Sequence, residues 1–163
     1  MARVFQKYFL TLTTLVSLSL LPFAIVKRSF KDWIIVFLVS ILGNSMADRY
    51  LVSRGFLKYK VRPLPDKFGI HLPFDFIHYP LLLLYFNQWT LNSKPLGMIL
   101  KLLLMVTPQV AIETYAAEKT NLITWRKGWS WKHSFVSMMI KFLLCRLIIA
   151  GIRVINKRSI STS

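Results

Sequence analysis

Acidic residues are scarce in this chain of 163 residues, which has six Asp and Glu against 22 Lys and Arg and a formal net charge of +16. Such a chain is expected to meet negative charge, either on nucleic acid or on anionic lipid headgroups. No recognisable nucleic-acid-binding motif is present, and the apolar runs are too long for a soluble basic domain. We therefore expect the lipid bilayer, with its anionic headgroups, as the main partner and no nucleic acid.

Cysteines and catalytic signatures are also nearly absent. Cys145 is the only cysteine, so no internal disulfide can form. The chain has no GxSxG elbow, no HExxH motif and no P-loop. His133 and Ser137 are one helical turn apart, a spacing too common to indicate a catalytic pair. We expect a protein that is not an enzyme and that binds no cofactor.

Apolar residues, in contrast, make up 55% of the chain, more than a soluble domain of this size can bury. Crossing a bilayer takes about 20 predominantly apolar residues in a helix. We expect one all-α domain over residues 1–163, an integral membrane helical bundle of about five transmembrane helices. The expected spans are about 8–26, 33–54, 70–91, 95–115 and 133–155.

The first run, residues 8–26, has two other interpretations. Arg3 and Lys7 precede it, as in a secretory signal, but such a signal needs small residues at the −3 and −1 sites. With Ala24 at −1, Pro22 would occupy −3, so we expect a retained span. If the run lies on the membrane surface instead, four spans remain.

Basic residues set the expected orientation. If five spans cross, the N-terminus, the loop 56–69 and the segment 116–132 share a side. With the helix end at Arg49 and Arg54, that side has about twelve Lys and Arg, against about six on the other. This favours a multi-pass protein of the cell membrane with a cytoplasmic N-terminus. The second helix should end at Gly55, which can supply the left-handed residue of a helix C-terminus. Asp48 then lies near the membrane surface.

The segment LITWRKGWSWK, residues 122–132, combines tryptophan with basic side chains. Tryptophan prefers the membrane interface, and Lys and Arg prefer the lipid phosphates. We expect it to anchor the inner surface, and contact with a partner protein is the alternative. The expected interface residues are Trp125, Arg126, Lys127, Trp129, Trp131 and Lys132.

His71, Asp75 and His78 have the i, i+4, i+7 spacing that places side chains on one face of an α-helix. Two imidazoles and a carboxylate could bind Zn²⁺ or Fe²⁺. Pro73 and Pro80 interrupt the backbone, however, and three such residues also fall at this spacing by chance. We expect no metal site.

Charged residues inside the expected spans need partners, because one at a helix centre costs on the order of 2.5–3.5 kcal/mol on insertion scales. Acids in the third and fourth spans can pair with cations in the fifth. Such a cluster would hold the helices together, and the alternatives are a proton or ion path and recognition of a lipid or partner protein. The expected intramembrane polar cluster is Asp48, Asp75, Asn87, Gln88, Glu113, Lys141 and Arg146, with Gln109 as a further candidate.

Three stretches, GFLKYKVRPLPD, YFNQWTLNSKPLGMILKLLL and IETYAAEKTNLITWRKGW, resemble a family of small uncharacterised multi-span membrane proteins of spore-forming, Bacillus-like bacteria. The likeness runs from about Trp33 to Arg153. It implies a multi-span membrane topology and names no reaction, and the two histidines are not part of its pattern. The polar positions that the resemblance marks are Asp48, Asp75, Asn87 with Gln88, and Glu113 with Thr120, Asn121 and Leu122.

These features predict a non-catalytic membrane component that acts through helix, lipid or partner contacts, where the partner is another protein or further copies of the chain. The alternative is a small transporter or an ion- or proton-conducting oligomer that uses Asp75 and Glu113. Five spans leave little room for a gated pathway within one chain, so this alternative requires an oligomer.

Overall fold

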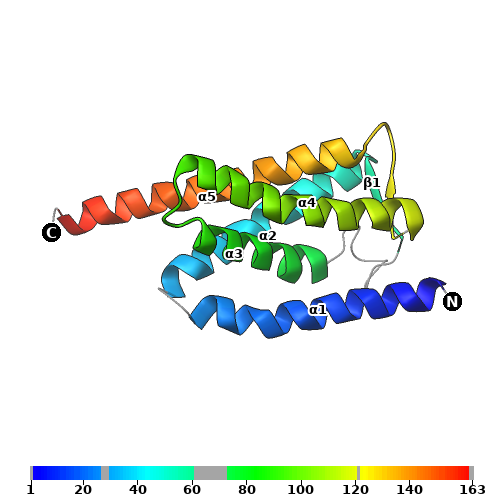
Figure 1. Cartoon of the computed structure of the whole chain (residues 1–163), viewed down its shortest axis with the longest axis horizontal. Coiled ribbons are helices and arrows are strands. Elements are labelled where there is room, and N and C mark those ends of the chain that lie inside the picture. The colour runs from blue at the N-terminus through cyan, green and yellow to red at the C-terminus, as the bar shows by residue number, and fades with distance from the viewer. Residues whose placement is uncertain (1, 27–29, 61–72, 121, 162–163) are drawn as a thin grey trace.

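Five α-helices dominate the computed structural model of this chain, which describes residues 2–26, 30–60, 73–120 and 122–161. Consecutive helices run in opposite directions, and the two termini lie at opposite ends of the molecule (Figure 1). A single turn of π-helix, η1, leads directly into α3, and two short strands pair at the end that carries the N-terminus. The elements are α1 (Ala2–Val26), α2 (Phe30–Ser53), β1 (Leu57–Tyr59), η1 (Phe74–His78), α3 (Tyr79–Trp89), α4 (Pro95–Lys119), β2 (Ile123–Trp125) and α5 (Trp131–Ser161).

Three of the described helices are long and apolar enough to cross a membrane, over Trp33–Ser53, Pro95–Lys119 and Trp131–Ile155. The apolar stretch Leu10–Ala24 within α1 is shorter, although α1 continues through Pro22 without ending. The mostly helical character predicted from the apolar runs is thus confirmed, together with three candidate spans.

The π-helical turn at η1 follows from the proline that comes after it. Pro80 has no N–H to donate, and the N–H of Tyr79 bonds to the Phe74 carbonyl five residues back. The predicted single face for His71, Asp75 and His78 assumes 3.6 residues per turn, which does not hold through η1. His71 lies outside the described residues.

The core of the bundle is packed around Phe142 of α5. Its ring centroid lies 5.8 Å from that of Tyr79 and 5.2 Å from that of Phe86, both in edge-to-face geometry. All three side chains are buried, and aromatic pairs of this kind contribute roughly 0.5–1.5 kcal/mol beyond their area. These contacts fix α3, and with it the adjoining η1, in the bundle, where η1 packs against α1 and α2.

The end of α2 at Gly55 is confirmed. Gly55 has a φ of 77°, and its N–H donates to Val52 O over 3.0 Å while the N–H of Phe56 donates to Leu51 O over 2.9 Å. This is the Schellman pairing that closes a helix with a left-handed glycine. The turn directs the chain into β1.

The two strands join segments that the sequence predicts as a loop and a surface anchor. They are antiparallel, with Leu57 opposite Trp125 and Tyr59 opposite Ile123. Three-residue strands are too short to show the alternation that identifies a strand. The pairing ties the end of α2 to the connection between α4 and α5, and we call this end of the bundle the sheet end (Figure 1).

Candidate functional site

A cluster of largely buried polar side chains lies toward the sheet end, where α2 packs against η1, α5 and β1. Asn44 and Asp48 are one turn apart on α2, a spacing that puts both on the same helix face. They are 2% and 5% exposed, and Asp75 in η1 is fully buried. We call Asn44, Asp48, Tyr59, Asp75 and Lys141 the polar cluster.

Asn44 is the bridge of this cluster. Its Nδ2 donates to Asp75 Oδ1 over 2.7 Å, and its Oδ1 accepts a hydrogen bond from Lys141 Nζ over 2.8 Å. An amide offers a donor and an acceptor on one planar group, which neither a carboxylate nor an ammonium can do. One side chain of α2 therefore holds η1 on one side and α5 on the other.

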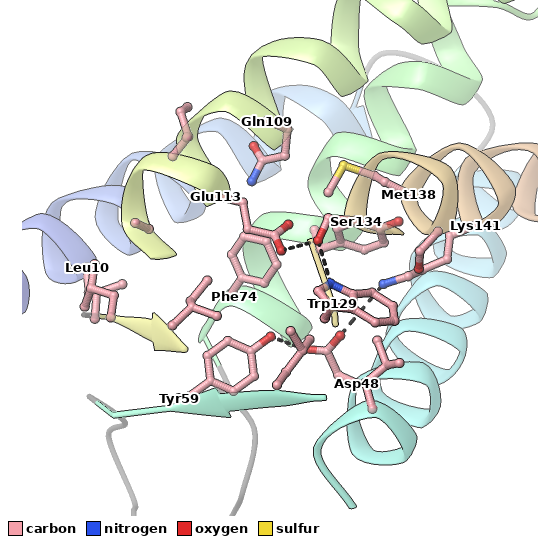
Figure 2. Close-up of a pocket in the computed structure, with 18 residues that line it drawn as sticks. Leu10, Asp48, Tyr59, Phe74, Gln109, Glu113, Trp129, Ser134, Met138 and Lys141 are labelled. Atoms are coloured by element: carbon pink, nitrogen blue, oxygen red, sulfur yellow. Dashed lines mark hydrogen bonds and ion pairs between the residues drawn. The ribbon is translucent and has the colours of Figure 1, made fainter. Parts of the chain in front are cut away.

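Asp48 has two partners. Tyr59 of β1 donates its hydroxyl hydrogen to Asp48 Oδ2 over 2.6 Å, and Lys141 Nζ lies 3.8 Å from Asp48 Oδ1 (Figure 2). Burial, followed by the charge of Asp48, raises the pKa of Tyr59 well above its ordinary value. The hydroxyl thus keeps its proton and remains a donor to the carboxylate.

Lys141 is the cation of the cluster. Besides Asn44 and Asp48, its ammonium lies 4.9 Å from the centroid of the Tyr79 ring, within the range of a cation–π interaction. Its side chain is 20% exposed, so water or lipid reaches only a minor part of it. Breaking a buried pair of this type by removing one partner typically costs about 3–5 kcal/mol, and partial exposure reduces that value.

Glu113 of α4 reaches the same end of the bundle but has a separate partner. Ser134 Oγ of α5 donates to Glu113 Oε1 over 2.7 Å, and Trp129 Nε1 donates to Ser134 Oγ over 2.9 Å (Figure 2). A hydroxyl can accept one hydrogen bond and donate another at the same time, so Ser134 connects Trp129 to Glu113. This chain of bonds fixes α4 to the start of α5.

A pocket of about 110 Å³ lies between Glu113 and Asp48. Helices α2, α4 and α5 and both strands contribute to its wall, which is mostly apolar (Figure 2). A space of this size accepts a few waters or a small ligand. The polar residues that line it are Asp48, Tyr59, Tyr79, Gln109, Glu113, Ser134, Ser137 and Lys141.

Three residues of the predicted polar cluster have partners outside it: Asn87, Gln88 and Arg146. Asn87 donates to Leu83 O over 2.9 Å and to Cys145 Sγ over 3.7 Å. Gln88 donates to the Ala24 carbonyl of α1. Each of these two residues of α3 therefore links that helix to a different neighbour rather than to the acids.

Arg146 lies near the C-terminal end of α3, where its Nη2 donates to the carbonyls of Thr90 over 3.4 Å and Leu91 over 3.3 Å. The end of a helix carries partial negative charge, which a cation neutralises. Arg146 follows Lys141 by five residues, which on an α-helix is a rotation of about 140° and a rise of about 7.5 Å. The two cations of α5 therefore point to different neighbours.

Asp75 and His78, which share the helical spacing considered above for a metal site, have separate partners. Asp75 binds Asn44, whereas His78 Nδ1 lies 2.9 Å from Ser17 Oγ and its Nε2 lies 3.4 Å from Gln109 Oε1. Within the part of the chain that the structure describes, no group of three His, Cys, Asp or Glu could hold a metal ion.

The predicted interface segment lies at the sheet end and divides into two sets. Trp129 packs on Phe56 and His133, with ring centroids 5.6 and 5.4 Å apart, and is half-buried, as is Trp125. The other four side chains are exposed. They are Arg126, Lys127, Trp131 and Lys132.

No family model matches this chain, and comparisons with curated proteins and with solved structures give no match. The resemblance to small membrane proteins of Bacillus-like bacteria therefore stays a prediction.

Proposed function

We propose that this protein is a non-catalytic, multi-span component of a cell membrane that acts through the contacts of its helices with lipid or a partner protein. The observation that supports this is the engagement of the acids near α5, each of which accepts a hydrogen bond or an ion pair from another element. Polar contacts between helices are a recognised means of holding a membrane bundle together. The pairs are Asp48 with Tyr59 and Lys141, Asp75 with Asn44, and Glu113 with Ser134.

The proposed topology has five spans, with the sheet end and the N-terminus in the cytoplasm. It is supported by the alternating direction of the helices (Figure 1). It is also supported by the exposed basic residues in and next to the two strands. Cytoplasmic loops carry an excess of Lys and Arg. The described basic side chains exposed there include Lys58, Lys60, Arg126, Lys127 and Lys132.

The test is the thermal stability of purified protein in detergent. Asp75→Ala and Glu113→Ala each leave a donor of another element without its acceptor, which typically costs about 1–3 kcal/mol. We expect both variants to unfold several degrees below the wild type. Glu118→Ala is the matched control, because Glu118 is exposed on the same helix as Glu113 and should leave the melting temperature unchanged. Unchanged melting of Asp75→Ala and Glu113→Ala would refute a structural role for these acids.

Conduction of protons or ions by an oligomer is the second candidate. It is favoured by the excess of three acids over one lysine among the polar side chains inside the bundle. It is also favoured by Asp75 Oδ2, which is buried without a hydrogen-bond partner among the described residues. Asp75→Asn and Glu113→Gln keep an acceptor oxygen but remove the titrating group. Proton flux into liposomes that is lost in these two variants would establish conduction, and flux equal to that of empty liposomes would exclude it.

A further inference from the structure

A groove of about 780 Å³ runs between α2 and α5, with Tyr79 and Leu83 of α3 also lining it. Its volume falls within the range typical of sites that bind small organic molecules. Small residues of α2, Gly43 and Ala47, form part of one wall. A Cβ added at Gly43 would meet nothing within 4 Å, so no side chain fills this space. We call it the α2–α5 groove.

The wall formed by α5 is an apolar stripe. Four side chains at intervals of four residues line the groove, and each is about half exposed. Since α5 is one of the helices long and apolar enough to cross a membrane, this stripe would face acyl chains rather than water. The four residues are Val136, Ile140, Leu144 and Ile148.

The groove is lined by basic side chains and, among the described residues, by no carboxylate. Lys132 and His133 line it at the first turn of α5, and Lys141 lines it farther along. The Nδ1 atom of His133 lies 2.9 Å from Ser130 Oγ, so Nε2 is the ring nitrogen available to an anion. An occupant should therefore combine an apolar body with a negative head.

The dimensions match a lipid of one leaflet. From Lys132 to Ile148 the helix rises about 24 Å at ~1.5 Å per residue, and half of a bilayer core is about 15 Å thick. The groove is thus long enough for a headgroup followed by an acyl chain. Trp129 and Trp131 flank the basic end, as tryptophans do at the level of lipid headgroups.

We propose that the α2–α5 groove binds an anionic phospholipid, with the phosphate at Lys132 and His133 and an acyl chain along the apolar stripe of α5. Basic pockets between transmembrane helices commonly bind anionic headgroups in this way. A second copy of the chain could cover the apolar stripe, but an apolar face would supply no anion for Lys132. The inference deepens the lipid contact in the proposed function and rests on the membrane placement proposed there.

The experiment is native mass spectrometry of the full chain in detergent, titrated with phosphatidylglycerol or with phosphatidylcholine of the same acyl chains. We expect phosphatidylglycerol to bind at least 5-fold more tightly. Gly43→Leu should fill the groove and weaken that binding at least 10-fold. Gly151→Leu is the matched control: Gly151 is exposed on α5, lies outside the groove, and a Cβ there also meets nothing within 4 Å.

Lys132→Gln is the second variant, and it should leave the stability of the fold unchanged because Lys132 is exposed. It should reduce the preference for phosphatidylglycerol while leaving phosphatidylcholine binding unchanged. Equal binding of the two lipids by the wild type, or equal binding by Gly43→Leu and Gly151→Leu, would overturn the proposal. So would a dimer in the same spectra that Gly43→Leu dissociates, because a second copy would then occupy the groove.

Failure of this inference is distinguishable from failure of the proposed function. If the groove binds no lipid but Asp75→Ala still lowers the melting temperature, only the lipid site is refuted. If alkaline carbonate extracts the protein from membranes, the integral placement itself fails, and the lipid site fails with it.

Discussion

The ammonium of Lys141 lies 2.8 Å from the side-chain oxygen Oδ1 of Asn44, although the two residues are 97 positions apart in the chain. This bond orients the amide so that its Nδ2 faces Asp75, to which it donates. A cation and an acid on different elements are therefore joined through one neutral side chain. Lys141 and Asp75 are thus linked without a direct ion pair between them. The Nζ atom of Lys141 also lies 3.8 Å from Asp48 Oδ1.

The first prediction concerns the hydroxyl of Tyr59. Tyr59→Phe removes the donor to Asp48 without changing the shape of the ring, and hydrogen bonds to charged groups are worth about 1.5–3 kcal/mol. We expect a lower melting temperature in detergent at pH 8. Tyr115→Phe is the control, because Tyr115 is 63% exposed and its hydroxyl should matter little.

The same variant should also alter the dependence of stability on pH. Because the pKa of Tyr59 is raised in the folded state, the protonated hydroxyl stabilises the fold below the ordinary value of 10.0, and this contribution is lost as the pH rises above it. The difference in melting temperature between the wild type and Tyr59→Phe should shrink between pH 9 and pH 11. A constant difference over that range would contradict the raised pKa.

Two glycine substitutions should change stability in opposite directions. Gly55 has a φ of 77°, and a Cβ there would also approach Lys127 Nζ to 3.4 Å, so Gly55→Ala should destabilise by about 1–2 kcal/mol. Gly151→Ala should stabilise by up to about 1 kcal/mol, because Gly151 lies within α5 with open space around it. The free energy of unfolding of each variant can be measured in mixed micelles. Two changes of the same sign would contradict the backbone conformations described for Gly55 and Gly151.

Orientation can be tested with single cysteines in a Cys145→Ser background. Lys127→Cys lies at the sheet end and Lys94→Cys lies next to α4 at the opposite end, and both positions are exposed (Figure 1). A membrane-impermeant thiol reagent added to intact cells should label Lys94→Cys and spare Lys127→Cys, and permeabilised cells should label both. The reverse pattern in intact cells would place the N-terminus outside.

The features that the sequence predicts well are those that depend on neighbouring residues. Long apolar runs identify the helices that carry Trp33–Ser53, Pro95–Lys119 and Trp131–Ile155, and Gly55 marks the end of α2 because a left-handed residue there favours glycine. Asn44 could also have been assigned to the site, since it lies one turn from Asp48 on the same face of α2.

The features that escape prediction depend on contacts between distant segments. Tyr59 reaches Asp48 only because β1 pairs with β2, and neither strand is long enough to show a pattern. Ser134 meets Glu113 only because α4 packs on α5. Arg146 carries the same charge as Lys141, but the rotation of α5 between them directs it to the end of α3.

The central claim is that Asn44 and Lys141 act as one unit that holds α5 to α2. A double-mutant cycle tests it most directly, with the free energy of unfolding measured in mixed micelles for Asn44→Ala, Lys141→Met and the double variant. Asn92→Ala, at an exposed turn, is the control for the loss of an amide. We predict that each cluster variant destabilises the protein and that the double variant loses at least about 1 kcal/mol less than the sum of the two. Strict additivity of the two losses would contradict the account, because the bond between Asn44 and Lys141 would then contribute nothing to the fold.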